Sequence, residues 1–151
     1  FVSVGTIFSS AFFPHLARNP KVIGLFHKLM IYIGVAISIG CYFSATLISN
    51  VLFSSQNIEV SYYIKLLTPG IFFAYIVLSY HNNGLMLIGR DDVVQRITVF
   101  SSVILFIFGL ALVYRLNIVG AVFMIVCGRG VMAASGAYAY RILTSNKRVI
   151  E

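Results

Sequence analysis

The sequence predicts an all-α fold, a polytopic transmembrane helix bundle with about four full spans plus one partial span at the N-terminus. Of its 151 residues, 60% are hydrophobic and 10% are charged, whereas about a quarter of the residues of a soluble domain are charged. The apolar residues form runs of roughly 20, the length of helix that crosses the hydrocarbon core. No run alternates between apolar and polar residues, so a membrane β-barrel is not expected.

Five apolar stretches follow one another along the chain, with approximate bounds 1–13, 29–49, 66–88, 97–114 and 118–140. The last four are long enough to cross a membrane, residues 97–114 barely so. The first ends at Pro14 and has neither a basic segment nor a cleavage site, so it is not a signal peptide. We expect it to be the end of a longer helix, and the chain to be a fragment that lacks its N-terminal part. Because no linker divides the chain, residues 1–151 are treated as a single transmembrane domain.

The positive charges separate by loop into two groups, as expected for a membrane protein with one side in the cytoplasm. The larger group contains Arg18, Lys21, Lys28, Arg90, Arg96, Arg141, Lys147 and Arg148. The smaller group contains Lys65 and Arg115. The larger group, and with it the C-terminus, is predicted to be cytoplasmic. The net charge of +7 therefore reflects orientation in the lipid bilayer, and no nucleic acid is expected as a partner.

The first connection, which includes "NPKVIGLFHKL", admits two interpretations. It could form a short interfacial helix with Val22, Ile23, Leu25 and Phe26 toward lipid. The alternative, an ordinary basic loop, is favoured. His15 and His27 are then both loop residues.

Few residues suggest chemistry. Asp91 and Asp92 form the one pair of carboxylates, but a Mg²⁺-diphosphate site needs a second acidic cluster. They are better explained as solvated residues beside Arg90 and Arg96 that cap the next helix. The three histidines have no metal-ligand spacing, and no nucleotide-binding or nucleophile motif occurs. Cys41 and Cys127 share no redox spacing. The sequence thus predicts no enzyme, no metal site and no cofactor.

The segment "SYHNNG" places three successive polar residues, His81, Asn82 and Asn83, near the cytoplasmic end of the span over residues 66–88. Together they cover most of a helix circumference, so at least one faces protein or water. One hypothesis is a substrate or proton-relay contact. The alternative, somewhat favoured, is hydrogen bonding between helices that aids packing.

Arg129 is the one charged residue between Gly120 and Tyr140. It lies about 16 Å of helix from either end of its span, too far for its side chain to reach the headgroups. Ala133 and Gly136 share its face, and Gly128 and Gly130 flank it, which favours an inward position with close helix approach. We hypothesise that Arg129 attracts an anionic, phosphate-bearing substrate. A structural arginine paired with a carboxylate upstream of Phe1 is equally compatible.

Four features together carry a family resemblance: "FFPHLARNPK", "SYYIKLLTPGIFFAYIVLSYHNNGLMLIGRDDVVQRITV", "RLNIVGAV" and the short basic tail. Their order, spacing and loop parity resemble the C-terminal part of a bacterial polysaccharide flippase of the O-antigen translocase (Wzx) type. This type belongs to the multidrug/oligosaccharidyl-lipid/polysaccharide exporter superfamily. The resemblance covers essentially the whole chain.

The resemblance implies two six-helix lobes around a central cavity, with this chain forming most of the second lobe. The missing N-terminal lobe would then be its partner. It implies a translocase in the bacterial inner membrane that moves a polyprenyl-diphosphate-linked oligosaccharide from the cytoplasmic to the periplasmic leaflet. Arg129 would suit the diphosphate, with His81, Asn82 and Asn83 as further candidate substrate contacts. Alternatives are a drug exporter or peptidoglycan lipid-precursor flippase of the same superfamily and, further off, a membrane glycosyltransferase or polymerase. A non-transporting membrane scaffold leaves a midplane arginine without explanation.

Overall fold

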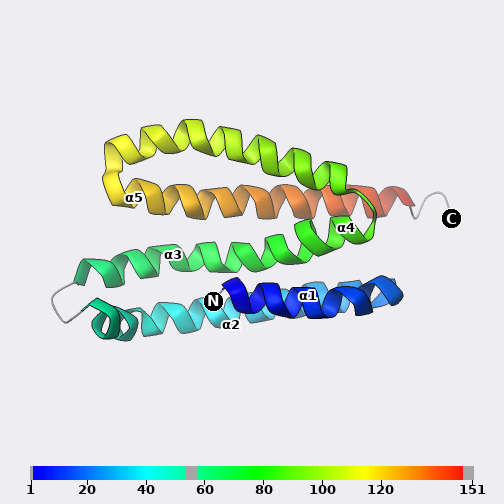
Figure 1. Ribbon diagram of the computed structural model, residues 1–151, viewed down its shortest axis with the longest axis horizontal. Coiled ribbons are helices and arrows are strands. Elements are labelled where there is room, and N and C mark those ends of the chain that lie inside the picture. Colours follow the sequence, from blue (N-terminus) through cyan, green and yellow to red (C-terminus); the bar gives the residue numbers. More distant parts are fainter. Residues whose placement is uncertain (1, 54–57, 148–151) are drawn as a thin grey trace.

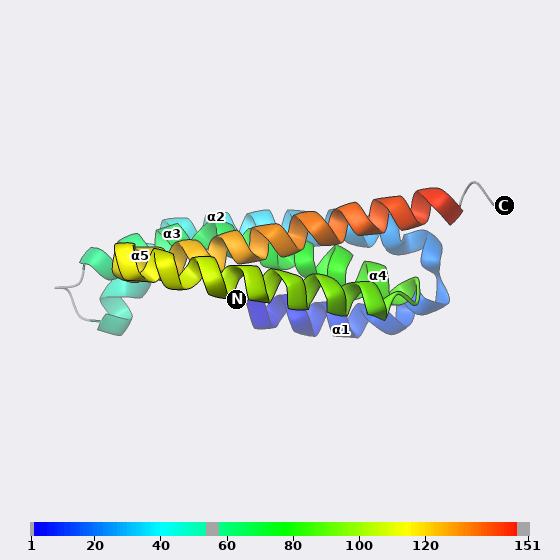
Figure 2. The same ribbon diagram turned by 90° about the horizontal axis from the view of Figure 1, so that it is seen from above.

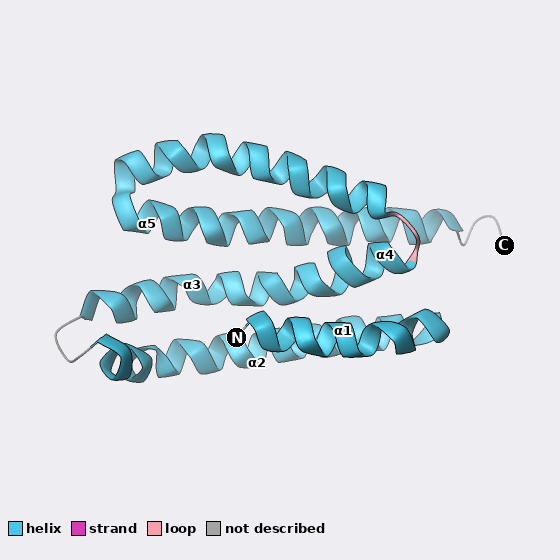
Figure 3. Ribbon diagram, viewed as in Figure 1, coloured by secondary structure: helices cyan, strands magenta, loops and turns pink. Residues whose placement is uncertain are grey.

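The computed structural model describes residues 2–53 and 58–147, and almost all of them are helical (Figure 3). The elements in chain order are α1 (Val2–Arg18), the 3₁₀ turn η1 (Pro20–Val22), α2 (Ile23–Phe53), α3 (Ile58–Ile76), the π-helix η2 (Val77–Gly84), α4 (Leu85–Leu87) and α5 (Asp91–Lys147). The described residues include no strand. The all-α prediction is therefore confirmed.

Helix α5 contains two membrane crossings joined by a reversal. It is continuous over 57 residues except at Asn117, whose φ of 49° and ψ of −128° are not helical. Asparagine adopts a positive φ more readily than most residues. The chain doubles back there (Figure 1), so residues 91–116, the first half, run antiparallel to residues 118–147, the second half. The halves touch where Gly128 faces Leu105 and Gly109 faces Met124.

Three helices of the described part are long and apolar enough to cross a membrane, namely residues 23–52, 59–87 and 91–145. Since the third folds into two halves, the bundle has four crossings plus the shorter α1. This matches the predicted four full spans and one partial span. The exposed surface is apolar, with Ile7, Phe43 and Phe100 each more than 70% exposed. Such exposure is what a helix surface in contact with lipid requires.

The continuous helix formed by α3, η2 and α4 is the centre of the bundle. It packs against both α2 and α5, and η2 also contacts α1. Figure 2 shows α2 and the second half of α5 on one side, with α1 and the first half of α5 on the other. The main buried cluster joins Leu16, Phe26, Met30, Tyr75 and Leu78.

The turns that carry most of the basic residues lie together. The α1–α2 turn, the turn before α5 and the C-terminal part of α5 gather at one end (Figure 1). We call this the basic end; its lysine and arginine side chains within the described residues are Arg18, Lys21, Lys28, Arg90, Arg96 and Arg141. Lys65 belongs to the first half of α3 and Arg115 lies two residues before the break at Asn117; both segments lie at the opposite end (Figure 1). The side chain of Lys147 and all of Arg148 lie outside the described residues.

The prediction for the first connection was wrong. Helix α1 continues past Pro14 to Arg18, and α2 already begins at Ile23, so His15 and His27 are both helical. Phe26 and His27 are 2% and 5% exposed and point into the bundle, so the segment is neither a loop nor an interfacial helix. Lys21 and Lys28 are exposed. Lys21 lies in the turn η1, but Lys28 belongs to α2, because a helix can extend beyond the hydrocarbon with its lysine in the headgroups.

Candidate functional site

Helix α3 is shaped locally by Pro69 and Gly70. Proline has no N–H, so the carbonyl of Lys65, four residues earlier, loses its helical donor. The hydroxyl of Thr68 replaces that donor, with its Oγ1 2.5 Å from the Lys65 oxygen and 3.2 Å from that of Ile64. Gly70 presents no side chain, and an added Cβ would lie 3.3 Å from the Val126 side chain. The second half of α5 therefore comes close to α3 at this level.

Arg129 lies directly beside that close approach. Its Nη1 donates a hydrogen bond to the Gly70 carbonyl oxygen at 3.2 Å. A guanidinium has five N–H donors, and the structure records a protein partner for one of them. Among the described residues, the salt bridge found joins Arg90 and Asp92 at the basic end. The carboxylate partner considered from the sequence is therefore not supplied by the described chain.

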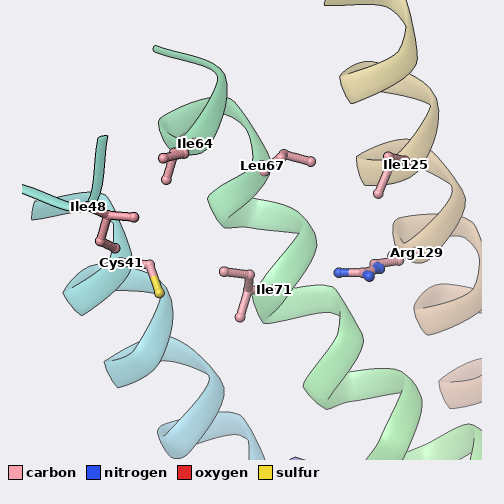
Figure 4. A pocket seen from close by; sticks show the side chains of 7 residues that line it. All are labelled: Cys41, Ile48, Ile64, Leu67, Ile71, Ile125 and Arg129. Atoms are coloured by element: carbon pink, nitrogen blue, oxygen red, sulfur yellow. The ribbon is translucent and has the colours of Figure 1, made fainter. Parts of the chain in front are cut away.

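The half-buried Arg129 faces a cleft between α2, α3 and the second half of α5. We call it the arginine cleft; it is lined by Cys41, Ile48, Ile64, Leu67, Ile71, Ile125 and Arg129. Figure 4 shows the guanidinium extending from α5 toward α3. The cavity of about 440 Å³ is in the size range of small-molecule sites. Apart from the Cys41 thiol, Arg129 is the one polar side chain in an apolar lining.

The depth and orientation expected for Arg129 agree with the structure. Twelve residues separate it from the reversal at Asn117 and twelve from Arg141, about 18 Å of helix in each direction. On the same face, Gly136 packs against His81 of η2, and Ala133 is 3% exposed. Gly130 faces Phe73 at ordinary contact distance. The face that carries Arg129 therefore packs toward the centre of the bundle.

The π-helix η2 contains the other predicted candidates. His81 and Asn83 are buried, and Asn82 is half-buried. Asn83 uses both protons of its amide, donating to Ser9 Oγ of α1 at 2.6 Å and to the Leu78 oxygen at 2.9 Å. His81 Nε2 lies 3.1 Å from Thr98 Oγ1 of α5. Because Thr98 donates its own proton to the Val94 oxygen at 2.9 Å, it accepts from His81.

His27 adds a contact from α2 that the sequence analysis missed. Its Nδ1 lies 2.6 Å from Ser79 Oγ, and its ring stacks on Tyr80 and meets the edge of Tyr140. A histidine within the apolar run "GLFHKLM" was the available signal.

The polar side chains around η2 form one connected set, which we call the polar hub. Its residues are Ser9, His27, Ser79, Tyr80, His81, Asn83, Thr98 and Tyr140. It joins η2 to α1, α2 and both halves of α5. Within the described residues, His27 Nε2 and His81 Nδ1 are buried without a hydrogen bond.

The four candidate residues do not form one site. Gly70, the partner of Arg129, is eleven residues from His81, about 16 Å along the helix. Asn82 and Asn83 line a separate cleft beside α1, together with Thr6, Ser9 and Ser10. For His81 and Asn83, hydrogen bonding between helices accounts for the contacts observed. Arg129 stands apart as the charged group with unused hydrogen-bond capacity.

The paired carboxylates and the two cysteines are also among the described residues. Asp92 accepts two hydrogen bonds from Arg90, at 3.0 and 3.3 Å, in an exposed pair that raises the pKa of Arg90. Asp91 begins α5. Cys41 and Cys127 are free thiols. No group of three metal-binding side chains is found there.

No family model, curated protein or solved structure matches the chain. Its function is therefore inferred from the chemistry of the site. That chemistry is one guanidinium at mid-depth in a membrane-spanning helix bundle, facing an apolar cleft.

Proposed function

We propose that the chain is part of a flippase that moves polyprenyl-diphosphate-linked O-antigen or polysaccharide repeat units from the cytoplasmic to the periplasmic leaflet of the bacterial inner membrane. The observation that carries the proposal is Arg129, whose guanidinium faces an apolar cleft with one of its five donors bonded to protein. The resemblance of the whole chain to O-antigen translocases suggests the substrate class.

The arginine cleft offers the two kinds of contact that such a lipid requires. A guanidinium binds diphosphate oxygens through paired, charge-assisted hydrogen bonds and stays charged in an apolar environment. Isoleucine and leucine side chains of α2 and α3 offer apolar contact to the adjoining hydrocarbon. An arginine at this depth costs several kcal/mol on insertion scales, and a bound anion would offset part of that cost.

The bundle contributes binding and movement rather than bond cleavage. In the proposal it is the second of two lobes, which rock about a midplane site in alternating access. The excess of arginine and lysine at the basic end supports a cytoplasmic location for that end and for the C-terminus. No residue is assigned a catalytic role, because translocation breaks no covalent bond.

The test is complementation of a bacterial strain that lacks its O-antigen translocase, using the full gene that encodes this chain. Arg129→Ala and Arg129→Gln are expected to lower surface O-antigen at least tenfold, because a charged hydrogen bond contributes about 1.5–3 kcal/mol. Arg129→Lys should retain part of the activity, since it keeps the charge but loses the paired geometry. Arg115→Gln, an exposed arginine on the same helix, is the matched control and should have no effect. Full activity of all three Arg129 variants at normal expression contradicts the proposal.

A further inference from the structure

A second cleft, away from the arginine cleft, runs between the two halves of α5 toward the basic end. We call it the α5 groove; it is lined by Arg96, Ile97, Phe100, Ser101, Ile104, Val131 and Ser135. Its volume is about 370 Å³. From Arg96 to Ile104 it extends eight residues, about 12 Å along the helix. Phe100, Ile104 and Val131 are each more than 40% exposed, so the groove opens on the surface that meets lipid.

Arg96 is the charged member of this groove, and its nearest acidic neighbour is already engaged. Asp92 lies four residues earlier, the spacing at which an acid and a base pair on a helix. Both carboxylate oxygens of Asp92 instead accept hydrogen bonds from Arg90. Among the described residues, Arg96 forms no ion pair. Its charge acts on Asp92 without a hydrogen bond between the two side chains. The guanidinium at the mouth of the groove therefore keeps its donors for another anion.

The position of Arg96 matches the level of a lipid headgroup. It is five residues from the start of α5, about 8 Å of helix, which an arginine side chain can span to reach the interface. Deeper in the groove the lining is apolar, apart from small serines. The Ser135 hydroxyl donates a hydrogen bond to the Val131 oxygen of its own helix at 2.7 Å, so its proton does not need a partner from a ligand.

We propose that the α5 groove binds one anionic phospholipid of the adjacent leaflet, with the lipid phosphate on Arg96 and an acyl chain along Ile97, Phe100 and Ile104. Charge complementarity selects the anionic headgroup, and the apolar walls select the chain. This site is independent of the proposed flippase activity, because it shares no residue with the arginine cleft.

The experiment is native mass spectrometry of the detergent-solubilised chain with added phosphatidylglycerol or phosphatidylcholine of identical acyl chains. The wild-type chain should retain phosphatidylglycerol in preference. Arg96→Gln should reduce its bound fraction about fivefold, the factor that corresponds to ~1 kcal/mol per arginine near a charged headgroup. Arg115→Gln, at the other end of the same half of α5, is the matched control and should change nothing.

Two further arms separate the lipid site from simpler explanations. Ser135→Phe fills the groove without a change of charge and should weaken binding of both lipids, while circular dichroism confirms unaltered helix content. Glycerol 3-phosphate, which offers the phosphate without an acyl chain, should not bind. Equal losses in Arg96→Gln and Arg115→Gln, equal retention of the two lipids, or binding of glycerol 3-phosphate at the level of phosphatidylglycerol would each overturn the proposal.

Discussion

The polar hub and the arginine cleft both adjoin the central helix formed by α3, η2 and α4, but they differ in how many protein partners their polar side chains have. In the hub, side chains from α1, α2 and the first half of α5 form hydrogen bonds to residues of η2, and Tyr140 of the second half of α5 adds a ring contact to Tyr80. In the cleft, Arg129 has one bond to a backbone carbonyl and apolar side chains around it. Both regions bring polar groups to membrane depth, where an unpaired group is costly.

From this difference we infer a structural role for the hub and propose a binding role for the cleft. Polar groups that find partners within the bundle hold helices together. A charged group at membrane depth that finds no counter-ion in the described chain is by default a candidate ligand site. The hub should therefore respond to mutation through stability, and the cleft through activity.

The largest effect on stability is expected at the tightest contact of the hub. A Cβ on Gly136 would lie 2.9 Å from the His81 side chain and 3.3 Å from its backbone. Gly136→Leu should therefore lower the free energy of unfolding by about 3 kcal/mol, measured by circular dichroism in detergent. Gly40→Leu is the control, because nothing lies within 4 Å of that position. Equal stability of the two variants would show that the close packing of Gly136 against His81 does not stabilise the bundle.

A smaller effect measures the hydrogen bond between η2 and α1. In a double-mutant cycle of Asn83→Leu and Ser9→Ala, we expect a coupling energy of about 0.6–1.7 kcal/mol, the range for such bonds in membrane bundles. Ser10→Ala replaces a neighbouring exposed serine and should show no coupling to Asn83→Leu. Coupling of the same size at Ser10 would indicate a general disturbance of α1 rather than this bond.

An effect of similar size concerns the α3 backbone beside the arginine cleft. Thr68→Val removes the hydroxyl that bonds the Lys65 carbonyl and should cost about 1 kcal/mol in the same unfolding assay. In the background of Pro69→Ala, which restores an N–H to that carbonyl, the cost should shrink. If the cost persists in that background, Thr68 stabilises α3 by a contact other than its bond to the Lys65 carbonyl.

The sequence predicted the number of spans, the reversal near "RLN" and the inward face of Arg129, because each follows from apolar length or helical spacing. It did not predict the start of α2 at Ile23, since lysines in the headgroup region look like loop charges. The π-helix at Val77–Gly84 was also missed, because π-helical turns are rare and the apolar pattern was interpreted with α-helical spacing. Nor could spacing show that Arg129 and His81 belong to different places, which depends on how α5 folds back over α3.

The most direct test of the central claim is the thermal unfolding of Arg129→Gln in detergent, with and without undecaprenyl diphosphate. We expect the variant to melt at or above the wild-type temperature, because the substitution removes the desolvation cost of a half-buried charge and breaks one hydrogen bond and no ion pair among the described residues. We expect the lipid, at about 100 times its dissociation constant, to raise the melting temperature of the wild type by about 5–10 °C and that of the variant hardly at all. A variant that melts well below the wild type yet keeps the full shift would show that Arg129 is structural and that the lipid binds elsewhere.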